Sequence, residues 1–262
     1  MAKSSTALYL YCVVRAPRRP GFARVPRGLR EAAAPEAHRL AASLWLITAT
    51  VPLAVYGPAA LEPRLRDLDW VAEAAVAHES VVEYFTRARG TIVIPMKLFT
   101  MFSSLEKAIV EVGEGRAEIE RAMKRIAGSE EWGVRVARLP AASAVARGPA
   151  QRPASGAAFL AARKDARDAT ALARASAVAA AEKAFIRLGR YAREARRRER
   201  RPEPGTNPPV LEAAFLVKSA ARARFKAEAR RQAAACASAG AEMTLTGPWP
   251  AYNFVASQET PS

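Results

Sequence analysis

The sequence predicts an α+β protein built from two domains. Short runs of β-prone residues alternate with longer helical segments along its 262 residues. The second half has the order β-α-β-α-β, whereas the first half has three strands before its first long helix. This change of pattern near residues 128–132 predicts domains at 1–130 and 131–262. Half of the residues are hydrophobic, so a core can be buried, although alanine supplies much of that half.

The first strand is predicted over residues 7–14, ALYLYCVV. Tyr9 and Tyr11 alternate there with leucines, which is the period of a strand. The segment 15–30 is rich in arginine and proline and has no acidic residue. It is therefore expected to be an exposed basic loop, of unassigned role.

Residues 40–61 carry no charge and form a stretch long enough to cross a bilayer. Pro52 interrupts the stretch, and β-branched and aromatic residues dominate it. These features favour two strands, at 44–49 and 51–56, with a kink between them. We therefore expect no membrane span.

A helix is predicted over residues 70–88, with Asp69 as its N-cap. His78 lies on the apolar face of this helix, where a histidine is more often a buried structural residue than a ligand. A short buried strand at 91–94 follows and ends at Pro95.

A second helical region begins at Ser103, which has Glu106 three residues later, the spacing of a capping box. Gly113 and Gly115 interrupt the apolar stripe that follows, so two short helices are expected. Gly128 is predicted to end the second of them.

In the second half, residues 133–138 alternate as a strand, and 140–157 are typical of a flexible connection. An alanine-rich helix with a strongly basic end is predicted at about 158–200, followed by a proline-rich loop at 202–209. The remaining elements are expected as a strand at 210–217, a helix from Ser219 to Ala239 and a last strand around Met243 and Leu245.

The net charge says more about possible partners than the two cysteines do. The formal net charge is +16, which predicts attraction to nucleic acids, anionic membranes or acidic proteins. The alternative interpretation is a basic surface that is in contact with solvent only and binds no partner. Cys12 and Cys236 are far apart and lack metal-ligand spacing, so both are expected to be buried and reduced.

Catalytic motifs are missing from the sequence. It contains two histidines, His38 and His78, and no phosphate-binding loop, nucleophile elbow, zinc spacing or calcium loop. We therefore expect no enzymatic activity, no cofactor, no metal site and no small-molecule substrate.

Nucleic-acid binding is the alternative function that the charge allows. Basic segments occur at 15–30, 187–201 and 222–231. They contain no recognisable DNA-binding motif, and aromatic residues are not interleaved with them as base stacking requires. The sequence therefore does not favour this alternative.

The end of the chain, LTGPWPAYNF, is the most unusual segment. Pro248 and Pro250 stiffen the backbone, and Gly247 permits angles that other residues resist. Its aromatic side chains predict either a plug for the domain's own core or a docking edge for another protein, namely Trp249, Tyr252 and Phe254. One hypothesis has Trp249 buried and Phe254 exposed.

In combination, these motifs resemble the gas vesicle GvpL/GvpF family. The resemblance rests on the tyrosine-rich first strand, the His78 helix leading into IVIPMKLF, and the GPWPAYNF end, in that order. The segments EWGVRV and AAFLV are also similar to the family. Three residues depart from the family pattern. The family often has glycine at the position of Phe99, proline at that of Ala251 and serine at that of Asn253.

The resemblance implies an N-terminal α+β domain and a C-terminal modified ferredoxin-like domain carrying the long basic helix. It implies a cytoplasmic accessory or minor structural protein of gas vesicles that acts in nucleation and assembly. The implied partners are the hydrophobic shell protein and other accessory proteins, and no catalytic activity is implied. The motif residues carried over as structural are Tyr9, Tyr11, His78, Pro95, Gly247, Pro248 and Pro250.

Overall fold

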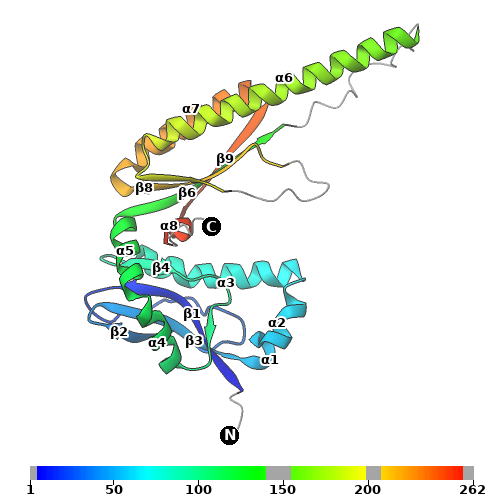
Figure 1. Cartoon of the computed structure of the whole chain (residues 1–262). Helices are drawn as coiled ribbons and strands as arrows, with labels where there is room; N and C mark the ends of the chain where they lie inside the picture. The colour runs from blue at the N-terminus through cyan, green and yellow to red at the C-terminus, as the bar shows by residue number, and fades with distance from the viewer. Residues whose placement is uncertain (1–4, 140–154, 199–207, 256–262) are drawn as a thin grey trace. The chain divides into compact units, whose positions relative to one another are not determined.

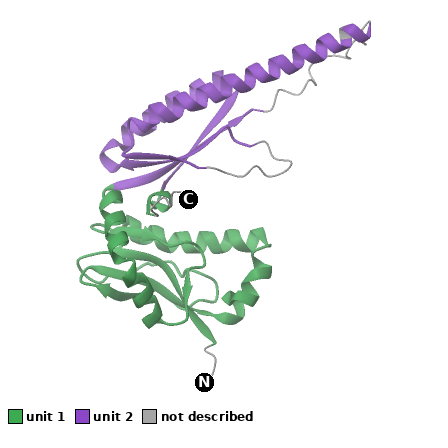
Figure 2. Ribbon diagram, in the orientation of Figure 1, with its two compact units in different colours: residues 1–128, 249–262 green, residues 129–248 purple. Residues whose placement is uncertain are grey.

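A computed structural model describes residues 5–139, 155–198 and 208–255. The chain forms two compact units (Figure 2), one made of residues 1–128 and 249–262, the other of residues 129–248. The predicted division into 1–130 and 131–262 stays a prediction. The compact units differ from it mainly in the final segment, which groups with the first unit.

The first unit is built on an antiparallel sheet with the strand order β2-β3-β1-β4, and β5 also pairs with β1. Tyr9 to Val14 are fully buried, so the central strand carries core side chains on both faces. The strands are β1 Thr6–Arg15, β2 Glu36–Ala41, β3 Leu44–Pro52, β4 Ile92–Pro95 and β5 Met101–Phe102.

The uncharged stretch at 40–61 forms a strand followed by helices, whereas two strands were predicted there. β3 runs unbroken to Pro52, and helices α1 Leu53–Tyr56 and α2 Pro58–Arg64 follow. The prediction of a strand at 51–56 is wrong because Pro52 ends the strand, where its missing N–H is no loss. In the described parts of the chain, every helix is too short or too polar to cross a bilayer.

The main helix of the first unit is α3, Leu68–Arg87. Its N-cap is Asp67, whose carboxylate accepts the N–H groups of Asp69 and Trp70, so the predicted cap at Asp69 is two positions late. The buried face packs on the sheet through Ala74, His78, Val81, Val82 and Phe85. This is the apolar face that contains His78, as the periodicity indicated.

Two short helices follow, α4 Leu105–Glu114 and α5 Arg116–Ile126. They meet at Gly115, which confirms the expected break. The N-cap of α4 is Ser104, which accepts the N–H of Lys107, and not the predicted Ser103. Gly128 adopts φ of 63° and ends this region as expected.

The second unit has the strand order β7-β8-β6-β9, with α6 and α7 on one face of the sheet (Figure 1). Its elements are β6 Ser129–Arg138, α6 Gly156–Gly189, β7 Glu194–Arg197, β8 Leu211–Lys218, a 3-10 turn η2 Ser219–Ala221, α7 Arg222–Ser238 and β9 Ala241–Trp249. This βαββαβ order is a ferredoxin-like arrangement. The core packs around Trp132, Phe215 and Phe225.

The long helix is shorter than predicted, ending at Gly189 and not at 200. The basic stretch that follows contains the edge strand β7, which the sequence analysis missed. Its arginines are paired, because Arg196 contacts Glu194 and Arg197 contacts Glu182 at 2.6 Å. Most of the predicted connection 140–157 and of the loop 202–209 lies outside the described residues.

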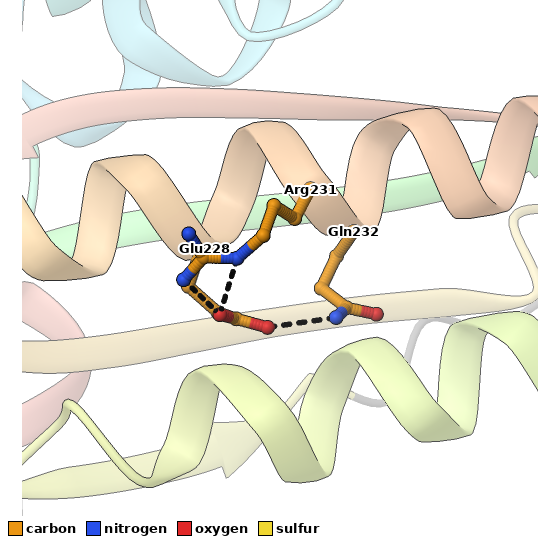
Figure 3. Close-up of polar contacts among 3 residues, drawn as sticks. All are labelled: Glu228, Arg231 and Gln232. Atoms are coloured by element: carbon orange, nitrogen blue, oxygen red, sulfur yellow. Dashed lines mark hydrogen bonds and ion pairs between the residues drawn. The ribbon is translucent and has the colours of Figure 1, made fainter.

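A polar cluster on the side of α7 that faces α6 combines the buried Glu228 and Gln232 with the exposed Arg231 (Figure 3). The Glu228 carboxylate accepts hydrogen bonds from the Arg231 guanidinium, at 2.5 and 3.0 Å, and from the Gln232 amide, at 2.7 Å. Arg231 and then Gln232 hold the pKa of Glu228 below its usual value. These bonds satisfy an acid that is 7% exposed, so it can lie between the two helices.

Candidate partner-binding site

The terminal aromatic residues occupy opposite environments. Trp249 ends β9 and is 41% exposed, whereas the Phe254 side chain is fully buried. The hypothesis of a buried Trp249 and an exposed Phe254 is therefore wrong. The reason is that the chain continues beyond Pro250 into a short helix, α8 Tyr252–Val255, which turns Phe254 inward.

Helix α8 packs against α5 and β4 within the first unit. The Tyr252 hydroxyl donates a hydrogen bond of 2.6 Å to the Glu79 carboxylate of α3. Burial, and then the bond to Glu79, raise the pKa of Tyr252. Tyr252 and Phe254 thus hold α8 in place, and of the three proposed contact residues Trp249 is the most exposed, at 41%.

The stiff segment before α8 lies at the edge of the second unit's sheet. Gly247 has φ of 117°, a value that favours glycine, and Pro248 follows it within β9. Pro250 is buried and accepts the N–H of Tyr252 at its carbonyl. Because β9 is the last strand in the sheet order, Pro248 interrupts no central ladder.

Tyr9 and His78 form a buried contact between the first strand and α3. The Tyr9 hydroxyl lies 2.7 Å from His78 Nδ1 and accepts the N–H of Phe99 at 3.2 Å. Burial lowers the pKa of His78 to about 4, an effect that hydrogen bonding with the Met96 backbone partly opposes. His78 is therefore neutral at pH 7 and structural.

Tyr11 packs in the same cluster, with its ring centroid 4.8 Å from Tyr9 in an edge-to-face arrangement and 5.6 Å from His78. Its hydroxyl accepts the N–H of Leu29, which ties the basic loop to the core. Burial raises the pKa of Tyr11 to about 12. The loop 15–30 is thus anchored at Leu29, which is 2% exposed, and is not wholly solvent-exposed as predicted.

Pro95 ends β4 opposite Cys12, and Met96 next to it donates its N–H to the Tyr11 carbonyl. Four sequence motifs far apart in the chain therefore meet in the first unit: the tyrosine strand, the His78 helix, the Pro95 segment and the terminal aromatics. No pattern in the sequence indicated Glu79 as the partner of Tyr252. Only its position next to His78 could have indicated it.

A pocket of about 550 Å³ lies between α3 and the loop of residues 27–32. Tyr56 and Trp70 form its apolar side, and its charged side chains are Arg27, Arg30, Glu31 and Glu73. Among the described residues that line it, none is a histidine, cysteine, serine or threonine. In the described ranges, no group of acidic, histidine and cysteine side chains is placed to hold a metal ion.

Comparisons with known proteins agree over nearly the whole chain. The family model described as gas vesicle synthesis protein GvpL/GvpF matches residues 7–256. Gas vesicle protein L of Streptomyces sp. (strain CB03234) is 32% identical over 218 residues, which cover 79% of this chain and 78% of that protein.

Two crystal structures of the gas vesicle protein GvpF have the same fold. The protein from Anabaena sp. PCC7120 aligns with a TM-score of 0.66 at 14% identity, covering 97% of this chain and 98% of that one. The protein from Microcystis aeruginosa aligns with a TM-score of 0.62 at 14% identity, covering 96% and 99%. At this identity the likeness concerns the fold.

Proposed function

The chain belongs to the GvpL/GvpF family of gas vesicle synthesis proteins, and from this we propose that it acts in vesicle nucleation and assembly by binding other polypeptides. Its partners are the hydrophobic shell protein and other accessory proteins, which it meets in the cytoplasm at the forming vesicle. It works without catalysis, cofactor or small-molecule substrate.

The observation that carries this proposal is the position of Trp249. A large aromatic side chain, 41% exposed, stands at the end of an edge strand between two prolines. Tryptophan is the residue most enriched in binding hot spots, and the stiff backbone limits the entropy lost on binding. The outer edge of β9 presents backbone groups that can pair with a strand of a partner.

The chemistry of the shell protein makes such a partner useful. A very hydrophobic subunit aggregates in water unless its apolar surface is covered. A strand edge and an exposed tryptophan can hold the subunit until it joins the growing shell. The net charge of +16 steers acidic partners towards the protein and raises the rate of encounter.

Co-purification of the tagged protein with co-expressed shell protein tests the proposal. The change Trp249→Ala is expected to lower the recovered shell protein severalfold, because it removes the exposed anchor. Leu68→Ala is the matched control, since Leu68 is an exposed apolar residue outside the proposed contact, at 80% exposure. Recovery that is unchanged by Trp249→Ala, or lowered equally by Leu68→Ala, would count against the site.

The alternative of nucleic-acid binding loses support from the ion pairs of the second unit. Arg197 pairs with Glu182, Arg222 with Glu130, and Arg231 with Glu228. Part of the basic charge in the segments 187–201 and 222–231 is thereby neutralised within the protein. A salt-sensitive mobility shift of duplex DNA at physiological ionic strength would restore this alternative.

A further inference from the structure

The N-terminal part of α6 has no partner within the described chain. From residue 155 to 176 every described side chain is exposed, and burial begins at Ala177, which is fully covered. Figure 1 shows the reason, because α7 lies beside the later part of α6 and the earlier part extends beyond it. Within the described part of its own unit, nothing covers these roughly six turns of helix.

Charges on this arm are sorted by face. At about 100° per residue, Arg163, Arg167 and Arg174 fall within an arc of about 40°. Asp165 and Asp168 lie roughly 140–160° away from Arg163 by the same geometry. One face of the arm is therefore cationic and the acidic residues are on the other side.

Two apolar residues complete the cationic face. Leu160 and Val178 are eighteen positions apart, which is five whole turns, and both lie within about 60° of the arginines. They are 66% and 39% exposed. We call this set of residues the cationic stripe: Leu160, Arg163, Arg167, Arg174 and Val178. It is about 27 Å long at 1.5 Å per residue.

The stripe borders two hollows that share Arg138 and Arg174. One, of about 530 Å³, is lined by Arg167 and Thr170 as well, and the other, of about 470 Å³, by Val178 and Val210 together with Pro208 and Pro209. Among the described residues, those that line the two hollows include no aspartate or glutamate. Among the described residues, no ion pair joins Arg138, Arg167 or Arg174 to a carboxylate.

Arg138, Arg167 and Arg174 place three positive charges around these hollows and attract an anionic group that approaches them. Some other arginines of this unit do pair with acids, since Arg196, Arg197 and Arg231 each contact a glutamate. The hollow of about 470 Å³ is also lined by valine and proline, and the other by two alanines. The ligand that fits is therefore anionic and apolar together, which describes a polypeptide better than a phosphate backbone.

We propose that the cationic stripe, together with Arg138, is the docking site for an acidic amphipathic helix of a partner protein. Glutamates spaced three and four residues apart would face Arg163, Arg167 and Arg174, and leucines at the same spacing would cover Leu160 and Val178. The site is separate from Trp249 and uses different residues, so it goes beyond the function proposed above.

The test uses fluorescence anisotropy with a labelled synthetic peptide of about 20 residues, the length of the stripe in helical form. The peptide carries glutamate and leucine at helical spacing on an alanine background. A second peptide has serine in place of leucine and the same charge. The third probe is a DNA duplex of matched charge.

The site variant is the triple change Arg138→Gln, Arg167→Gln and Arg174→Gln. Its control is Arg190→Gln, Arg224→Gln and Arg230→Gln, which removes the same charge from exposed arginines of the same unit. We expect the site triple to weaken binding of the leucine-containing peptide at least about tenfold and the control less than about twofold. The serine peptide is expected to bind more weakly than the leucine peptide.

Three results would overturn the proposal: no binding of the leucine peptide to the wild type, equal loss in both triples, or tighter binding of the duplex that depends on the site arginines. All the substituted residues are exposed or half-buried, so the fold is retained, and circular dichroism verifies this. Trp249→Ala should leave peptide binding unchanged, which separates this test from that of the shell-protein site.

Discussion

The Tyr252 hydroxyl and the Glu79 carboxylate are joined by a hydrogen bond of 2.6 Å although 173 positions separate them in the chain. The bond ties the last helix to α3 within the first unit. The chain thus leaves this unit after Gly128, forms the second unit, and returns at Trp249. The terminal aromatic motif therefore has two roles, closing a core and leaving Trp249 exposed.

Removing the Tyr252 hydroxyl should loosen this closure. We expect Tyr252→Phe to destabilise the first unit by about 1.5–3 kcal/mol, the range for hydrogen bonds to charged groups. Chemical denaturation measures the loss. Tyr84→Phe is the control, because the Tyr84 hydroxyl donates a longer, exposed bond of 3.2 Å to Gly21. Equal small effects of both changes would show that the Tyr252–Glu79 bond contributes little.

Phe254 and Trp249 should respond oppositely to truncation. Phe254→Ala is expected to cost about 3–5 kcal/mol, because the buried ring leaves a cavity. Trp249→Ala should cost less than Phe254→Ala, since Trp249 is 41% exposed and its removal leaves no closed cavity. Thermal unfolding of the two variants compares them. A larger loss for Trp249→Ala would contradict the assignment of Trp249 to binding.

Gly28 lies where a methyl group cannot fit. A Cβ there would come within 2.2 Å of the Tyr11 hydroxyl, and its φ is 77°. Gly90 has nearly the same φ, 76°, with nothing within 4 Å. We expect Gly90→Ala to cost about 1–2 kcal/mol for the backbone alone, and Gly28→Ala to cost roughly 1–3 kcal/mol more. Denaturation midpoints that do not differ would mean that the loop moves away freely.

His78 should make the protein less stable in mild acid. Its pKa is about 4 in the folded protein, below the ordinary value of 6.5, so the unfolded chain binds the proton more readily. The contribution of neutral His78 to the free energy of unfolding is complete above pH 6.5 and decreases as the pH falls towards 4. Between pH 7 and pH 5 the loss is about 2 kcal/mol.

Unfolding free energies of the wild type and of His78→Gln at both pH values isolate this effect. The wild type should lose about 2 kcal/mol more than the variant on acidification. An equal loss in both proteins would show that His78 does not titrate across this range on unfolding.

The sequence predicts best those elements whose periodicity is set by burial. The strand at 7–14 and the helix containing His78 appear within two residues of their predicted bounds, because apolar spacing defines them. The edge strands β2 and β7 were missed because they are polar and pair on one side only. β7 also lies within the region predicted as a helix, 158–200. Alanine and arginine favour a helix there, but the pairing of β7 with β8 outweighs this local preference.

The assignment of Trp249, Tyr252 and Phe254 to partner binding stays a prediction, and the orientation of their side chains could not be predicted. The prolines and aromatics of the terminal segment indicated a special role, and the turn of α8 decides which ring points inward. The contact between Tyr252 and Glu79 depends on a return of the chain to the first unit, which no local pattern encodes. The cationic stripe was hidden by the low overall amphipathicity of an alanine-rich helix.

Electron microscopy of cells that lack this gene tests the central claim most directly. We predict that the deleted cells form no gas vesicles, that the wild-type gene and the Leu68→Ala control restore them, and that Trp249→Ala restores few. Normal vesicles in the deleted cells would contradict the account.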